Sequence, residues 1–197
     1  QVVRETEARV RATREAIGDG PDIAIDIHAT LREPSKARQI INVTSPYRLL
    51  FVEEPALPHG IESTARQRRE TVTPIATGEN IFGLSRFSEL LDADGVDIIQ
   101  PDVIVCGGLL EMRKIAMLAE ARYVTVAPHN PSGFISTAMS VHFSATTPNF
   151  IILEFGQDHL KPTAEFVDKA WAPVNGYLEL PTKPGIGMEL NLKAISA

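Results

Sequence analysis

The sequence predicts an α/β fold, namely the C-terminal portion of a (β/α) TIM-type barrel with about six strands. Apolar runs that end in a polar group recur along the chain, and these groups are Asp26, Glu53, Glu79, Asp102, His129 and Glu154. Successive members are 23 to 27 residues apart, the length that a strand, a loop and a return helix require. A polar group at every strand end is typical of a barrel. A doubly wound sheet instead gathers its ligands at one switch point, so we favour the barrel.

A helix over 2–17 precedes the first strand, because apolar residues recur there every seven positions among charged ones. The Gly-Asp-Gly-Pro sequence that follows ends this helix. The run I-A-I-D-I-H-A at 23–29 is expected to be a strand. Because side chains alternate along a strand, Asp26 and His28 are predicted to point to the same side.

The rest of the chain alternates further strands with helices. The expected strands lie at 49–52, 72–76, 96–100, 123–127 and 150–153. The expected helices lie at 34–42, 61–70, 107–121, 136–145 and 163–170, with another that presents Phe87, Leu90 and Leu91 and ends near Gly95. The tail at 176–192 is rich in proline and glycine and is expected to form turns and short extended pieces.

The length of 197 residues is short for a complete barrel, which takes roughly 250 residues and eight strands. The sequence starts in a helix with no strand before it, so we interpret the chain as the C-terminal part of a larger protein. Residues 1–175 are expected to form the C-terminal part of the catalytic barrel, and 176–197 a C-terminal tail. Without the first strands, two barrel edges would be left unpaired.

The composition is that of a globular domain, with 44% hydrophobic and 22% charged residues. A net charge of −6 argues against a nucleic-acid partner, because phosphate binding favours a basic face. The sequence contains neither a membrane span nor a signal peptide, so we expect no membrane partner. The single cysteine, Cys106, excludes an internal disulfide and fits a reducing compartment such as the cytoplasm.

Three carboxylates follow consecutive predicted strands, namely Asp26, Glu53 and Glu79, and we expect them to converge at one rim. Three carboxylates in close proximity do not all stay ionised without a compensating cation. All-oxygen ligands favour Mg²⁺ or Mn²⁺ over zinc or copper. Singly, each acid has the simpler interpretation of a helix N-cap or a loop ion pair. The phased triple predicts a Mg²⁺ site.

Asp102 and His129 follow the next two strands. A carboxylate bonded to an imidazole fixes its tautomer and stabilises its protonated form, which makes a positioned general base. In barrel order, His28 lies across the metal from His129. This pattern suits abstraction of a proton α to a carboxylate, with the metal stabilising an enediolate and His28 protonating a leaving group or the opposite face. Alternatively, His28 only supports the metal-binding carboxylates.

Several other polar residues have weaker assignments. We expect Glu154 to hydrogen-bond a substrate oxygen, Asn80 to contact substrate, and Glu54 to support the ligands or form an ion pair. Surface or loop positions are the simpler interpretation of the three remaining histidines, which are His59, His142 and His159. Cys106 is expected to fill apolar space. The following Gly107-Gly108 lacks the G-x-G-x-x-G pattern of a dinucleotide site.

These motifs resemble a known family when they are taken in order. D-x-H, F-V-E-E-P, G-E-N, Q-P-D followed by G-G, A-P-H-N-P and L-E occur in the order and spacing of the enolase superfamily. More narrowly, they are similar to its mandelate racemase and muconate lactonizing branch, and the match includes the P-T-K-P-G-I-G tail. Histidine two residues after the first ligand resembles the galactonate dehydratase type of acid-sugar dehydratase.

The resemblance implies the metal, base and substrate-contact roles given above. It implies a hydro-lyase that dehydrates a sugar acid, such as galactonate, to a 2-keto-3-deoxy acid. His129 takes the C2 proton, and His28 protonates the departing C3 hydroxyl. The family's N-terminal capping domain and first two strands are absent from this chain, and the tail at 176–197 is expected to pack on the capping region. Relatives are commonly homo-oligomers.

Three alternatives differ in chemistry. A racemase or epimerase of a 2-hydroxy acid would use the same half-site, often with an opposing lysine on the missing second strand. A non-catalytic barrel would keep the metal site and act in binding or assembly. A phosphate-binding aldolase-type barrel would need a Schiff-base lysine at a strand end and a late Gly-rich phosphate loop, and neither is visible.

Overall fold

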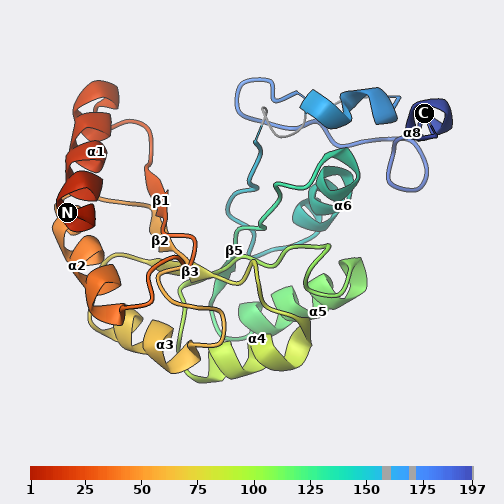
Figure 1. Cartoon of the computed structure of the whole chain (residues 1–197). Coiled ribbons are helices and arrows are strands. Elements are labelled where there is room, and N and C mark those ends of the chain that lie inside the picture. Colours follow the sequence, from red (N-terminus) through yellow and green to blue (C-terminus); the bar gives the residue numbers. More distant parts are fainter. Residues whose placement is uncertain (157–160, 169–171, 197) are drawn as a thin grey trace.

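The computed structural model describes residues 1–156, 161–168 and 172–196. Its centre is a parallel sheet in which sequential strands are neighbours, in the order β1 (Ala24–Asp26), β2 (Phe51–Glu53), β3 (Ile75–Thr77), β4 (Ile98–Ile99) and β5 (Thr125–Val126). The helices form an open arc with the strands on its inner side (Figure 1). This is the strand order and layering of a (β/α) barrel, which the sequence predicts.

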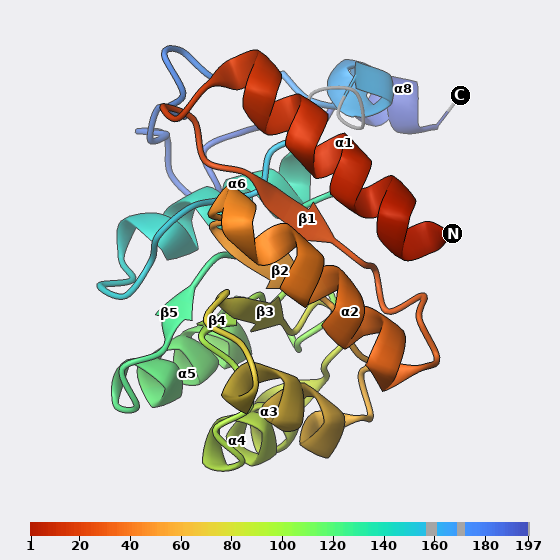
Figure 2. The ribbon, with the colours of Figure 1, turned by 90° about the vertical axis from the view of Figure 1, so that its left-hand side faces the viewer.

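Each strand is followed by a helix on the outer side of the sheet. These helices are α2 (Pro34–Thr44), α3 (Ile61–Arg69), α4 (Gly83–Asp92), α5 (Leu109–Glu120) and α6 (Phe134–Ala145), and α1 (Val2–Ile17) precedes β1. Viewed from the side, α1 and α2 lie next to each other over β1 and β2 (Figure 2). Shorter helices are η1 (Ser45–Tyr47), η2 (Lys161–Phe166) and α8 (Leu192–Ile195). No helix in the described part of the chain is long and apolar enough to span a membrane.

Both faces of the sheet are apolar, as expected for parallel strands covered by helices. On the outer face, Val52 and Ile75 pack against α1 and α2, and Ile99 packs against α4 and α5. On the inner face, the buried side chains are Phe51, Ala76, Ile98 and Ala127. The strands are thus held between two apolar layers, and the polar groups are left at their C-terminal ends.

The strands are shorter than the sequence predicts, and this changes one prediction. β1 ends at Asp26, and both His28 (φ +55°) and Ala29 (φ +49°) have left-handed backbone conformations. The prediction that Asp26 and His28 share one face of a strand is therefore wrong. A turn after the strand, and not the alternation of a strand, brings the two side chains together.

The predicted sixth strand at 150–153 forms only one parallel bridge, between Val126 and Phe150. The chain continues beside β5, because Ile151 N–H donates to Val126 O (3.0 Å) and Glu154 N–H to Pro128 O (3.4 Å). Its course is that of a barrel strand, and it delivers Glu154 to the rim of the sheet.

The structure also corrects the end of the chain. The predicted helix at 163–170 is a 3₁₀ helix, η2, over 161–166, and 169–171 lie outside the described residues. Val167 pairs with Leu190 of the tail, and Val174 pairs with Tyr177 of the tail. An apolar cluster joins Met188 of the tail to Phe134 and Ala138 of α6.

Candidate metal and acid–base site

Three carboxylates meet at the C-terminal ends of β1, β2 and β3. Asp26 is opposite Glu53 in the parallel ladder, and Glu53 is opposite Ala76, three residues before Glu79. Gly78, with φ +138°, turns the chain so that Glu79 joins the group. One oxygen of each carboxylate lies within 4.8 Å of the others. The convergence that the spacing predicts is thus present.

The electrostatics of this group favour a bound cation. The pKa of Glu53 is raised to about 7, mainly by burial and additionally by the negative charges of Asp26, Glu79 and Glu154. A hydrogen bond from Gln100 opposes this shift. A divalent cation would offset both the burial and the repulsion, and an all-oxygen donor set suits a hard cation such as Mg²⁺. The residues therefore fit the group that the sequence predicts.

His129 and Asp102 form the second part of the site. His129 Nδ1 lies 2.8 Å from Asp102 Oδ2, and Asp102 also accepts a hydrogen bond from the Ile104 N–H (2.7 Å). Asp102 is 1% exposed, so its carboxylate is held in place. Burial alone would lower the pKa of His129, but the bond to Asp102 and the charges of Glu154 and Glu79 outweigh it and raise the pKa. With Nδ1–H on Asp102, Nε2 is the nitrogen free to accept a proton.

His28 lies on the opposite side of Glu79. Its backbone N–H donates to Asp26 Oδ1 (2.5 Å), and its Nδ1 lies 3.2 Å from Asp26 Oδ2. The imidazole is 70% exposed, whereas that of His129 is 18% exposed. His28 is thus tethered to a candidate metal ligand while its ring is open to a substrate.

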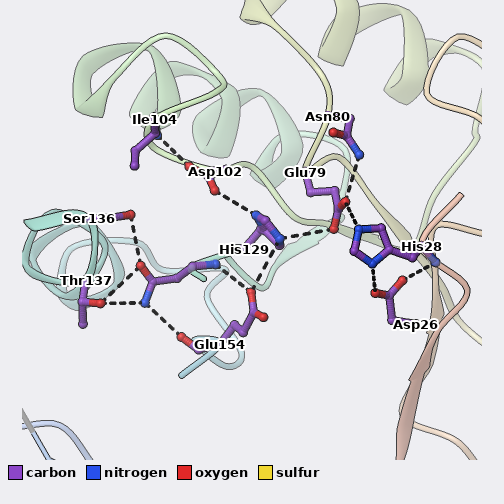
Figure 3. A network of polar contacts seen from close by, with 11 residues as sticks. Asp26, His28, Glu79, Asn80, Asp102, Ile104, His129, Ser136, Thr137 and Glu154 are labelled. Carbon is purple, nitrogen blue, oxygen red and sulfur yellow. Dashed lines mark hydrogen bonds and ion pairs between the residues drawn. The ribbon is translucent and has the colours of Figure 1, made fainter. Parts of the chain in front are cut away.

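Figure 3 shows that the Glu79 carboxylate lies between the two histidines. Its Oε1 is 3.8 Å from His28 Nε2, and its Oε2 is 3.3 Å from His129 Nε2. The Asn80 side chain donates to Glu79 Oε1 (2.9 Å). The two Nε2 atoms therefore approach one carboxylate from either side.

Glu154 completes the rim beside His129. Its Oε2 accepts the Asn130 N–H (2.7 Å) and lies 4.0 Å from His129 Nε2. Asn130 is fully buried, and its amide donates to Glu154 O and to Thr137 Oγ1 (3.1 Å each) while accepting from Ser136 (3.1 Å). This network, drawn in Figure 3, fixes the end of β5 to α6 and to the segment that carries Glu154.

Two buried side chains in this region, Asn130 and Gln100, have no role predicted from the sequence. Asn130 belongs to the quoted A-P-H-N-P motif and Gln100 to Q-P-D, so their positions next to assigned residues are the available signal. The sequence predicts that Glu54 supports the ligands or forms an ion pair. It is buried, burial raises its pKa, and its carboxylate contacts the chain just before Glu79.

The remaining residues lie as follows. His59 is exposed in the β2–α3 loop, and His142 lies half-buried on α6. His159 is outside the described residues. Cys106 is fully buried in the apolar cluster between α4 and α5, and burial with the nearby Asp102 charge raises its pKa to about 12. It is an apolar filler, as predicted.

A parallel sheet whose strand ends carry converging carboxylates and a carboxylate–histidine pair is the arrangement of a metal-dependent (β/α)-barrel enzyme. The chain belongs to the Enolase C-terminal domain-like family, whose model matches residues 1–194. This confirms the resemblance to the enolase superfamily and the predicted barrel fold.

Individual relatives support the same placement. The chain is 37% identical over 188 residues to a D-xylonate dehydratase from Haloferax volcanii, covering 95% of this chain and 45% of that protein. It is 38% identical over 190 residues to a D-galactonate dehydratase from Ralstonia nicotianae, covering 93% of this chain and 50% of that protein. The chain thus spans about half the length of these curated relatives. A crystal structure of an enolase from Agrobacterium radiobacter, with bound sodium and L-malate, superposes with a TM-score of 0.91 at 42% identity and covers 99% of this chain and 53% of that one.

Proposed function

We propose that the protein is a Mg²⁺-dependent hydro-lyase that dehydrates a sugar acid to a 2-keto-3-deoxy acid. The observation that carries the proposal is the position of Glu79 between two histidines, beside two further carboxylates. Dehydration needs one group to remove a proton and another to protonate a departing hydroxyl, and the two histidines are available for these roles. The named dehydratases that share 37–38% of the residues support this reaction class.

In this proposal Asp26, Glu53 and Glu79 hold the cation. When bound, Mg²⁺ supplies positive charge next to the substrate carboxylate and so favours loss of the α-proton. The three side chains come from adjacent strands, so the sheet fixes their mutual positions. The acidic cluster also explains how a protein of net charge −6 would bind an anionic substrate, because the cation reverses the local charge.

His129 is the proposed base that takes the C2 proton at Nε2. Asp102 holds the ring through Nδ1 and stabilises the imidazolium that forms. Glu154 and Asn80 are the proposed substrate contacts. Glu154 lies beside His129 with a carboxylate that is 49% exposed, so it can accept a hydrogen bond from a substrate hydroxyl.

His28 is the proposed acid that protonates the departing C3 hydroxyl. Its Nδ1 is oriented by Asp26, which leaves Nε2 to deliver a proton to a ligand near Glu79. The enol that results takes up a proton at C3, loses the proton of its C2 hydroxyl and so becomes the 2-keto-3-deoxy acid. The balance is loss of one water from the sugar acid.

The test is NMR of the purified protein with Mg²⁺ in D₂O and a panel of aldonic and aldaric acids. We expect 2-keto acid from one or a few sugar acids and none from a Glu79→Gln variant. Deuterium uptake or inversion at C2 without keto acid would instead assign a racemase or epimerase. Normal turnover by Glu79→Gln would contradict the metal site.

A further inference from the structure

Glu54 follows the candidate ligand Glu53 directly, yet its side chain takes a different course. It is fully buried, with 0% exposure, and has a left-handed backbone at φ +44°. This conformation is uncommon for a residue with a side chain and persists only where the surroundings maintain it. Burial of a carboxylate is a further cost unless it is hydrogen-bonded. A left-handed backbone and a buried carboxylate at one residue beside the site indicate that this residue has a specific role there.

The hydrogen bonds of Glu54 connect it to the chain on both sides of β2. Its Oε1 accepts from the Thr77 hydroxyl and from the Gly78 N–H (3.0 Å), the two residues before Glu79. Its backbone N–H donates to Ala76 O (3.0 Å). Its carbonyl accepts from Ala29 N–H (3.0 Å), which is in the turn that holds His28.

The turn at Gly78 has little freedom to move. With φ at +138°, an added Cβ would lie 3.0 Å from the Phe87 ring and 3.1 Å from the Gln100 backbone nitrogen. The turn is therefore packed closely against its neighbours, and its N–H points at Glu54 Oε1. Glu79 follows immediately, so the Glu54 carboxylate holds the Thr77–Gly78 peptide group, one peptide before the one that joins Gly78 to this ligand.

We propose that Glu54 is a positioning residue for the cation site, because its carboxylate fixes the Thr77–Gly78 turn that presents Glu79 while its backbone fixes the turn that presents His28. This role depends on one part of the proposed function, namely that the carboxylates of Asp26, Glu53 and Glu79 bind a divalent cation. Partners that orient metal ligands typically contribute about 10- to 100-fold to metal affinity.

The test measures Mn²⁺ affinity by electron paramagnetic resonance, with Mn²⁺ as the probe in place of Mg²⁺. We expect Glu54→Ala to weaken binding about 10- to 100-fold and Thr77→Val about 10-fold. Glu54→Gln keeps an oxygen that can accept both bonds, so it should retain most of the affinity that Glu54→Ala loses. Such a partial rescue is not expected of a residue that only fills space.

Thr44→Val is the matched control for Thr77→Val. Thr44 is also buried, and its hydroxyl donates to Ile40 O (2.8 Å) within α2, away from the site. Both variants lose one buried hydroxyl, so their urea unfolding in EDTA should change to a similar extent, whereas only Thr77→Val should lose Mn²⁺ affinity. If Thr77→Val binds Mn²⁺ as tightly as Thr44→Val does, the positioning role of Glu54 is overturned, while the cation site itself is not. A wild-type protein that binds no Mn²⁺ overturns the cation site as well.

Discussion

Cation binding at this site should release a proton from Glu53. The pKa of this carboxyl is about 7 without a metal, because it is buried and surrounded by negative charge. A ligand carboxylate must be ionised, so the cation binds after the proton has left. A pKa of about 7 leaves Glu53 about 90% protonated at pH 6 and about 10% at pH 8. From Glu53 alone, the Mg²⁺ affinity should therefore fall about 10-fold from pH 8 to pH 6.

Isothermal titration calorimetry in buffers of different ionisation enthalpy counts these protons. Glu53 should release about 0.9 proton per Mg²⁺ at pH 6, about 0.5 at pH 7 and about 0.1 at pH 8. The His129 pKa is also raised, in part by Glu79, and a cation on Glu79 would oppose protonation of the ring. A His129→Gln background removes this second source, and the protons that are further lost on replacing Glu53 by Gln in this background are those of Glu53.

Glu53→Gln in the same background is the control, since the amide does not titrate. Its Mg²⁺ affinity should be lower than that of the parent at pH 8 and nearly independent of pH between 6 and 8. If the His129→Gln protein released no protons at pH 6 and bound Mg²⁺ equally well at pH 6 and pH 8, Glu53 would not be a buried ligand with a raised pKa.

Three other predictions concern the two histidines of the site and the buried cysteine. His28→Asn should spare exchange of the α-proton with D₂O but block loss of the hydroxyl, and loss of both signals in NMR would contradict the division of roles. Asp102→Asn removes a contact that raises the pKa of His129. The base acts in its neutral form, so the low-pH limb of the pH–rate profile should move to lower pH, and the rate should fall about 10²- to 10⁴-fold as ring orientation is lost. An unmoved limb would argue against the dyad. Cys106, with a pKa of about 12, should react with a thiol reagent at pH 8 only after unfolding in urea, and fast reaction in the native protein would contradict its burial.

The repeat of polar groups predicted the site better than it predicted the strands. The strand cores contain only two or three residues, yet Asp26 and Glu53 are paired in register, and Asp102 and His129 meet. The reason is that a βα unit of near-constant length returns the chain to the same height on the sheet. Because this constraint applies to whole βα units, it holds even where the predicted boundaries of individual strands and helices are wrong.

Local periodicity was less reliable where the chain leaves the sheet. Alternation along a strand predicted the position of His28 relative to Asp26, but the pairing has another cause, since His28 and Ala29 have left-handed conformations. The burial of Glu54 and the network around Asn130 could not be predicted in the same way. Each involves hydrogen bonds between segments more than 20 residues apart, which no local pattern specifies.

Glu79 connects more of the proposed roles than either of the other two cation ligands. Asp26 and the proposed acid His28 both lie at the end of β1, and of the two histidines Asp26 contacts only His28. Glu79 faces both histidines with its two oxygens while its carboxylate belongs to the acidic cluster. Replacing it removes a ligand and also changes the charge beside both imidazoles. Loss of activity in Glu79→Gln therefore does not separate metal binding from proton transfer. Replacing Glu53 does separate them, because Glu53 has no ion pair with a histidine among the described residues.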